Sequence, residues 1–277
     1  MNYKPIIIVA GEPNSIFFEI FFKVIRKKIK LNLVNEIEII NKKNNLKRIN
    51  LIDVDLKQSS AFSKITTKSN DYIATCFDIA IKLLKNNVSN KFINGPISKK
   101  TFLKNKYNGI TEYLADKTDS KKIAMVIYNK KLSVCPLTTH LPIKYVSKKI
   151  NASEIINKVK LIHNFWKDKF NMKVKIGITG LNPHCESIDN FSEDKSIILP
   201  AIKRLKKLKY NVEGPLSADT IFLKNNRKNF DLIIGMYHDQ VLAPIKTLFE
   251  YDAINITIRS EERRVGKECR SRWSPYH

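Results

Sequence analysis

The strongest structural signal in this chain comes from ten consecutive residues, Asp231-Leu232-Ile233-Ile234-Gly235-Met236-Tyr237-His238-Asp239-Gln240. Their short apolar run follows a polar segment, a pattern typical of a buried strand. His238 and Asp239 follow the apolar run, so the pair would stand where the strand ends. A histidine beside an aspartate in that position is well suited to metal binding or acid–base chemistry.

Apolar strands alternate with amphipathic helices along most of the chain. The sequence predicts strands at residues 4–10, 34–40, 91–93, 123–128, 132–137, 173–179, 231–235 and 253–258. It predicts helices at residues 16–28, 71–84 and 192–208, and a further helix that begins at a cap on Asn151. Residues 129–131 favour a hairpin between two of the strands, and residues 41–69 show no clear pattern. The alternation predicts an α/β fold with a largely parallel sheet and crossover helices.

Composition narrows the class of protein. A net charge of +24 raises the question of nucleic-acid binding, but the lysines are spread over the whole chain with few aromatic residues between them. We therefore interpret these lysines as residues of solvent-exposed faces. A basic nucleic-acid-binding protein stays as an alternative of another class. The four cysteines share no metal or disulfide spacing, and no apolar run is long enough for a membrane span. These features predict a soluble cytoplasmic protein.

Two further histidines occupy settings like that of His238. His140 follows the predicted strand at residues 132–137, and His184 follows the one at residues 173–179. Ligands of α/β sheets gather at the carboxyl ends of strands, and three imidazoles suit a divalent cation. Each histidine taken alone is more often structural, so spacing leaves both interpretations open. His163 is predicted to be a solvated helix residue.

The character of the sequence changes after Ile258. Five arginines occur in residues 259–277, where the apolar pattern is lost. A natural basic tail is one interpretation, and we favour translated adapter sequence fused to a truncated reading frame. We therefore predict a catalytic unit over residues 1–258 that is incomplete at its C-terminus. For residues 259–277, which include His277, we predict an artefactual or disordered tail.

Eight motifs occur in one order that is shared with a known family. They are Gly11-Glu12-Pro13, Asn94-Gly95-Pro96-Ile97-Ser98-Lys99, Gly109-Ile110-Thr111-Glu112-Tyr113-Leu114-Ala115, Thr138-Thr139-His140-Leu141-Pro142, Gly180-Leu181-Asn182-Pro183-His184, Gly214-Pro215-Leu216-Ser217-Ala218-Asp219-Thr220, Tyr237-His238-Asp239-Gln240 and Asn255-Ile256-Thr257. Over residues 1–258 the chain thus resembles the 4-hydroxythreonine-4-phosphate dehydrogenases of vitamin B6 biosynthesis. The resemblance implies an isocitrate/isopropylmalate-dehydrogenase-like α/β/α fold of two lobes, with the active site in the cleft between them. It also implies NAD, a divalent metal (Zn, Mg or Co) and a homodimer whose active site draws on both subunits.

We assign the family's site residues to this chain only at positions where its motifs match. The resemblance implies His140, His184 and His238 as metal ligands, and Thr111, Lys246 and Asn255 as substrate contacts. For Lys246, Asp219 and Asp239 we also expect a catalytic role. The resemblance assigns no NAD-contacting residue. Without the family, Thr111 reads as a helix N-terminus, Lys246 as a surface lysine, Asn255 as a turn former and Asp219 as a cap.

The chain departs from the family pattern at three places. Ile110 stands where the family usually has histidine, which leaves open a relative acting on another phosphorylated hydroxy acid. The first loop continues as Asn14-Ser15-Ile16 instead of a glycine-rich run, and the family's closing region is absent. We therefore expect the early α/β portion to fold, and little or no dehydrogenase activity from the chain as written.

Overall fold

The computed structural model describes residues 5–29, 38–39, 50–58, 62–104, 106–107, 109–118, 122–188 and 191–259. Of the predicted tail, all but Arg259 lies outside these ranges, so the predictions for it are untested. The chain divides into two compact units, Met1–Ile110 and Thr111–His277.

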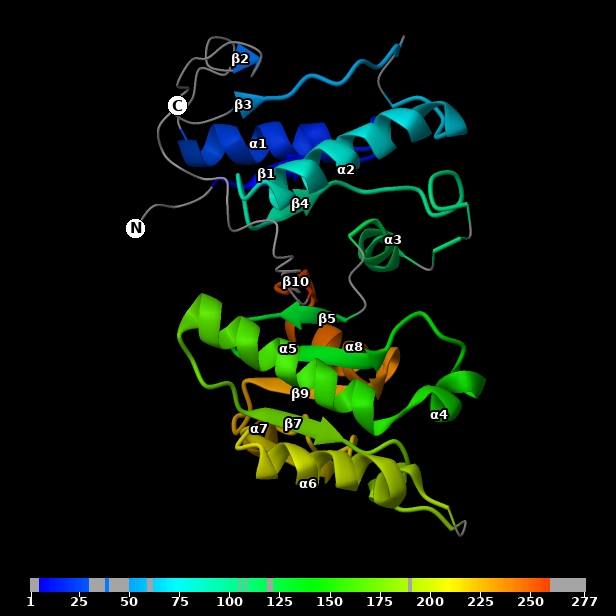
Figure 1. Cartoon of the computed structure of the whole chain (residues 1–277), viewed down its shortest axis with the longest axis vertical. Coiled ribbons are helices and arrows are strands. Elements are labelled where there is room, and N and C mark those ends of the chain that lie inside the picture. Colours follow the sequence, from blue (N-terminus) through cyan, green and yellow to red (C-terminus); the bar gives the residue numbers. More distant parts are fainter. Residues whose placement is uncertain are drawn as a thin grey trace, which may run out of the picture. The chain divides into compact units, whose positions relative to one another are not determined.

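The described part of the first unit contains two short parallel pairs of strands. Strand β1 (Ile7–Val9) pairs with β4 (Phe92–Asn94), and β2 (Glu38–Ile39) pairs with β3 (Asn50–Leu51) (Figure 1). The helices are α1 (Phe17–Ile29) and α2 (Asn70–Lys85). Helix α2 buries Ile73, Phe77 and Ile81 at the predicted helical spacing, together with Ala80, and leaves Leu84 half-buried.

One prediction for this unit needs correction. The strand at residues 4–10 was expected to be buried, but only one of its faces is. Side chains alternate along a strand, so Val9 is 3% exposed while Ile8 is 43% exposed. The helix predicted at residues 16–28 is present as α1, and Ile16 and Ile20 of its apolar face are exposed. Apolar spacing identifies a strand or helix, whereas burial depends on what packs against it.

The second unit is built on a mixed sheet of six strands in the order β10-β5-β6-β9-β7-β8. Their bounds are β5 (Ile123–Tyr128), β6 (Ser133–Thr138), β7 (Ile176–Thr179), β8 (Val212–Leu216), β9 (Leu232–Tyr237) and β10 (Ile254–Arg259). Strands β5 and β6 form the predicted antiparallel hairpin, and β10 lies antiparallel to β5 at the edge. The neighbours β6, β9, β7 and β8 are parallel, so their carboxyl ends meet at one edge of the sheet.

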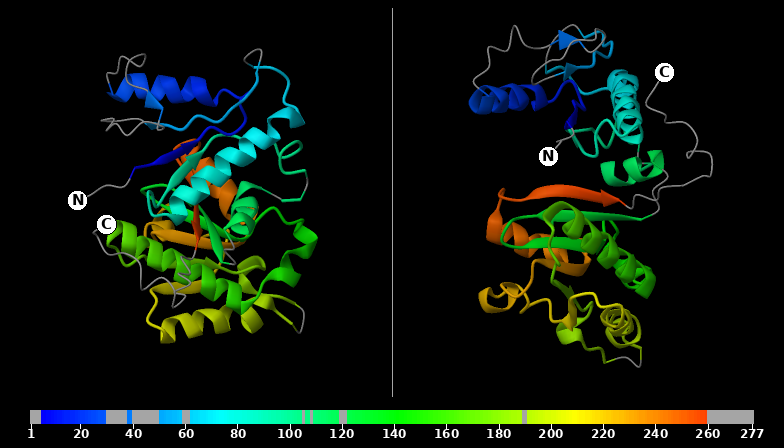
Figure 2. Two further views of the ribbon diagram at one scale, coloured as in Figure 1. Left: turned by 45° about the horizontal axis from the view of Figure 1, so that its top comes forward. Right: turned by 60° about the vertical axis from the view of Figure 1, so that its left-hand side comes forward.

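Helices cover both faces of this sheet (Figures 1 and 2). The helices of the unit are α3 (Ile110–Lys117), α4 (Val146–Lys149), α5 (Ala152–Phe170), α6 (Leu199–Lys207), α7 (Lys224–Arg227) and α8 (His238–Phe249). In β9, Leu232 and Ile234 pack into the core beneath α5 and α6, while Ile233 packs with Val241 of α8 on the opposite face. The result is a three-layer α/β/α unit, which confirms the predicted fold class.

A local signal placed the start of α5 correctly. The Asn151 side chain accepts a hydrogen bond from the Glu154 backbone N–H at 2.9 Å, so Asn151 is the predicted N-cap. The helix predicted at residues 192–208 is present, and it begins with a π-helical turn (Asp194–Ile198) that continues into α6. That turn places Asp194 inside the unit, where it is 1% exposed.

Candidate metal and substrate site

The three candidate metal ligands lie at the carboxyl ends of three neighbouring parallel strands. His140 comes shortly after β6, His184 follows β7, and His238 is the first residue after β9. Because the sheet order places β9 between β6 and β7, the three loops emerge side by side. The strand-end positions predicted from sequence are therefore confirmed, and this edge is where α/β sheets bind ligands.

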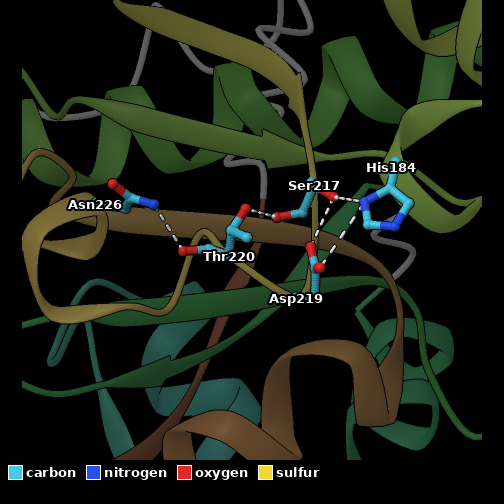
Figure 3. A network of polar contacts seen from close by, with 5 residues as sticks. All are labelled: His184, Ser217, Asp219, Thr220 and Asn226. Carbon is cyan, nitrogen blue, oxygen red and sulfur yellow. Dashed lines mark hydrogen bonds and ion pairs between the residues drawn. The ribbon is translucent and has the colours of Figure 1, made fainter.

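The histidines are not equally close to one another. The rings of His140 and His238 have centroids 5.7 Å apart. His184 lies beside Ser217 and Asp219, whose side chains point toward its ring (Figure 3). Within the described ranges, no three His, Cys, Asp or Glu side chains come together as a set that could hold an ion. One chain thus shows a histidine pair and a separate third histidine.

All three histidines share one arrangement: the ring Nδ1 faces a carboxylate. The pairs are His140 with Glu112 Oε1 at 3.8 Å, His184 with Asp219 Oδ2 at 3.8 Å and His238 with Asp239 Oδ1 at 2.7 Å. Metal-binding histidines generally place one ring N–H against a carboxylate or carbonyl, which leaves the other nitrogen for the ion. In addition, Glu112 Oε2 is buried and accepts no hydrogen bond from the described residues. The chemistry of each histidine therefore suits a divalent cation bound through Nε2, while in the described residues of one chain the three rings do not form a single cluster.

Ser217 forms a hydrogen bond with Asp219, the carboxylate beside His184. The Ser217 hydroxyl donates to Asp219 Oδ1 at 2.7 Å, and this bond lowers the pKa of the Asp219 carboxyl. The nearby His184 ring lowers this pKa further. Asp219 is therefore ionised near neutral pH, and its Oδ2 carries negative charge 3.8 Å from His184 Nδ1.

Two of the three histidines occupy an unusual backbone region. The φ angle is 36° at His140 and 54° at His184, and the next residue, Cys185, has φ 62°. Left-handed conformations are unfavourable for residues with a side chain, and they cluster at functional sites. This backbone feature is independent of the carboxylate pairing and marks the same two loops.

The loop that carries His184 is held by a buried carboxylate. Asp194 Oδ1 accepts from the Leu181 N–H at 2.8 Å, and Oδ2 accepts from Asn182 N at 3.2 Å and Asn182 Nδ2 at 2.8 Å. A side chain on Gly180 would place its Cβ 2.5 Å from Asp194 Oδ1, so this close approach requires glycine. Burial raises the pKa of the neighbouring Cys185 thiol, and Asp194 raises it further.

The predicted substrate residues fall into two places. Thr111 is buried at the start of α3, and its hydroxyl lies 3.2 Å from the Thr257 hydroxyl on β10. Asn255 is exposed and, being two residues from Thr257, projects from the same face of β10. Thr111 and Asn255 are thus associated with one strand.

Lys246 is placed differently. It lies eight residues along α8 from His238, about 12 Å along the helix axis. Its Nζ donates to the Glu250 carbonyl at 3.5 Å, at the far end of the helix. In this chain Lys246 therefore faces away from the end of α8 that carries His238.

Three residues around the histidines were missed by sequence reasoning: Glu112, Asp194 and Gln240. Glu112 and Gln240 lie inside quoted motifs, next to Thr111 and two residues after His238, so proximity was an available signal. Asp194 carried no such signal, because it opens a helix ten residues after His184. His163, predicted to be solvated, instead packs its ring edge-on against Tyr210 at 5.0 Å.

Comparison with known proteins identifies the family. Residues 4–261 match the family described as "Pyridoxal phosphate biosynthetic protein PdxA". The chain belongs to the PdxA family. A relative from Sulfurihydrogenibium sp. (strain YO3AOP1), named 4-hydroxythreonine-4-phosphate dehydrogenase, is 37% identical over 280 residues, covering 91% of this chain and 85% of the relative.

Other PdxA-like proteins differ in the substrate that they are named for. A D-threonate 4-phosphate dehydrogenase from Salmonella typhimurium is 30% identical over 214 residues, covering 76% of this chain and 65% of the relative. Among solved structures, a 4-hydroxythreonine-4-phosphate dehydrogenase from Klebsiella pneumoniae aligns with a TM-score of 0.75 and 26% identity, covering 92% and 88% of the two chains. In the described part of this PdxA chain, no helix is long and apolar enough to cross a membrane.

Proposed function

We propose that this PdxA chain is an NAD-dependent, divalent-metal-assisted dehydrogenase that oxidises and decarboxylates 4-phosphohydroxy-L-threonine in pyridoxal phosphate biosynthesis. The family match and the relative from Sulfurihydrogenibium support this reaction. The observation that carries the metal-assisted part is the carboxylate behind each of three histidines at neighbouring strand ends. Such strand-end groups suit a site that must hold both a cation and a substrate.

His140, His184 and His238 would hold the cation (Zn, Mg or Co). A divalent cation there supplies Lewis-acid stabilisation of negative charge on a substrate oxygen, and NAD supplies the hydride acceptor. Glu112, Asp219 and Asp239 would keep a proton on Nδ1 of each ring, so that Nε2 presents its lone pair to the site. These carboxylates act through the histidines, which refines the catalytic role expected for Asp219 and Asp239.

Substrate binding would rest on Thr111, Asn255 and Lys246. Thr111 and Asn255 would orient the substrate through hydrogen bonds, and Lys246 would pair with its anionic groups as a compact positive charge. The direction of Lys246, away from His238, supports a homodimer in which Lys246 serves the active site of the other copy. We further propose a cytoplasmic enzyme, because Cys76, Cys135 and Cys185 are free thiols.

A second substrate is favoured by one residue. Ile110 is apolar and partly buried next to Thr111, where the family usually has histidine. An isoleucine donates no hydrogen bond, so recognition of the substrate must differ at this point. D-threonate 4-phosphate, the substrate in the name of the Salmonella relative, is therefore the alternative substrate.

The test is a substrate panel on the purified protein with a divalent cation and NAD. We expect NADH to form with 4-phosphohydroxy-L-threonine in a version that carries the C-terminus of a relative, and little or none to form with the chain as written. NADH formation with D-threonate 4-phosphate alone would transfer the assignment to the alternative. No NADH with either substrate, in either version, would refute the proposed dehydrogenase activity.

A further inference from the structure

The side chain of Gln240 connects two of the strands that lead to candidate metal ligands. Gln240 lies in the first turn of α8 and is only 9% exposed. Its Oε1 accepts from the Met236 N–H of β9 at 2.6 Å and from the Thr179 hydroxyl of β7 at 2.9 Å. Its Nε2 donates to the Gly180 carbonyl at 2.8 Å. One amide thus connects the end of β9 with the end of β7.

The chemistry of this contact requires an amide. A carboxamide has one oxygen that accepts two hydrogen bonds and one nitrogen that donates, whereas a carboxylate only accepts and a thioether does neither well. The three bonds of Gln240 use both kinds of atom. The packing is also close, since a Cβ on Gly235 would lie 3.1 Å from Gln240 Oε1. Gln240 is therefore fixed in position by its surroundings.

The hydrogen bond from Gln240 to Gly180 is connected to His184 by a short segment, residues 181–183, whose backbone is itself hydrogen-bonded. Asp194 holds the backbone N–H groups of Leu181 and Asn182, the two residues that follow Gly180. The Cys185 N–H then donates to the Asn182 carbonyl at 3.0 Å, which closes a turn around His184. A displacement at Gly180 would therefore be transmitted to the His184 ring.

The strand of His140 is joined to the same network by a different residue. The Thr138 hydroxyl donates to the Met236 carbonyl at 2.8 Å, which connects β6 to β9. Loss of the Gln240 amide would leave this bond between β6 and β9 in place. Its effect should fall on the position of His184 relative to His238, and less on His140.

We propose that Gln240 is a positioning residue, which sets the separation of the His184 loop from the His238 turn and thereby the affinity of the protein for its divalent cation. This inference rests on the proposed metal site. Outer partners of metal ligands typically change metal affinity by about 10–100-fold when they are mutated. The competing explanation is that Gln240 only stabilises the fold, and the two explanations predict different measurements.

The experiment compares two Gln240 variants with a matched control in the full chain. Gln240→Met keeps the length of the side chain and removes all three bonds. Gln240→Glu keeps the acceptor atoms and removes the donor to Gly180. The control is Asn129→Ala, because Asn129 is a 7% exposed amide at the opposite end of β6, bonded to Lys131 N and to the Asp252 carbonyl.

Zn²⁺ alone is titrated calorimetrically into each protein, and thermal unfolding of the metal-free proteins is recorded. We expect Zn²⁺ binding about 10–100-fold weaker in both Gln240 variants and unchanged in Asn129→Ala, even where the control loses as much thermal stability. In ¹⁵N-histidine spectra of the metal-free protein, the signals of His184 and His238 should shift more than that of His140. Should Gln240→Met fail to fold, Gln240→Glu provides the comparison.

Zn²⁺ affinity in a folded Gln240 variant equal to that of the unmodified chain would overturn the positioning role. An equal loss of Zn²⁺ affinity in Asn129→Ala would also overturn the positioning role, because destabilisation of the fold would then account for the weaker binding. Failure of the metal site itself has a separate signature. The unmodified chain would then bind no Zn²⁺, or its binding would be unaffected by His184→Ala.

Discussion

Replacing Asp194 by asparagine tests whether a buried carboxylate holds the His184 loop. Asp194→Asn keeps the shape of the side chain and can keep the bond from Leu181 N. The other oxygen becomes an NH₂ group that faces two donors of Asn182, which now bond to Asp194 Oδ2 at 3.2 Å and 2.8 Å. The substitution therefore removes two hydrogen bonds and places donors against donors.

The cost follows from these two bonds. Hydrogen bonds to a charged group contribute about 1.5–3 kcal/mol each, and water can partly replace them at Asn182, which is half-buried. We expect the free energy of unfolding to fall by about 2–4 kcal/mol, a large part of a typical total of about 5–15 kcal/mol. At about 2–4 °C per kcal/mol for a domain of this size, Tm should fall by about 5–15 °C.

The assay is urea and thermal unfolding followed by circular dichroism, with Asp168→Asn as the control. Asp168 is an exposed aspartate of α5, so the same chemical change there should alter stability by less than about 0.5 kcal/mol. Zn²⁺ titration on the same samples should show weaker binding for Asp194→Asn. Equal unfolding midpoints for the two variants would refute the structural role of Asp194.

Four further changes probe the site and its surroundings. His184→Ala should lower bound Zn²⁺ with little loss of Tm, because His184 is exposed; unchanged stoichiometry in the folded variant would contradict its role as a ligand. Lys246→Ala should weaken calorimetric binding of 4-phosphohydroxy-L-threonine and leave Zn²⁺ binding intact, whereas equal substrate affinity would remove Lys246 from the site. Ile110→His should raise the affinity for 4-phosphohydroxy-L-threonine relative to D-threonate 4-phosphate, and an unchanged ratio would show that residue 110 does not select the substrate. Burial lowers the pKa of His163, and nearby Lys167 and Lys173 lower it further. The folded state therefore favours the neutral ring, and this contribution to stability is fully present above the ordinary histidine pKa of about 6.5. The contribution is lost as the pH falls from about 6.5 through the lower pKa that His163 has in the folded protein. His163→Gln should therefore flatten the pH dependence of urea unfolding in that window, and an unchanged slope would contradict this origin.

Local patterns in the sequence predicted much of the second unit. The apolar run before Gly235 is strand β9, the polar break at residues 129–131 is the hairpin between β5 and β6, and Asn151 caps α5. Each of these features depends on neighbouring residues: the alternation of a strand, the conformations of a turn, or the unpaired N–H groups of a helix start. The same rules were less successful for β1 and α1, where Ile8 and Ile20 are exposed.

By itself, the sequence determined which residues end strands, and therefore that His140, His184 and His238 would stand at the edge of a sheet. Only the tertiary structure decided that His140 faces Glu112 and that His184 faces Asp219, whereas Asp239 is the sequence neighbour of His238. It also decided that Gln240 joins β7 to β9. Periodicity records whether a position is apolar, which is a local property. The partner of a polar side chain depends on which distant strands pair, and pairing is settled by packing of the whole unit.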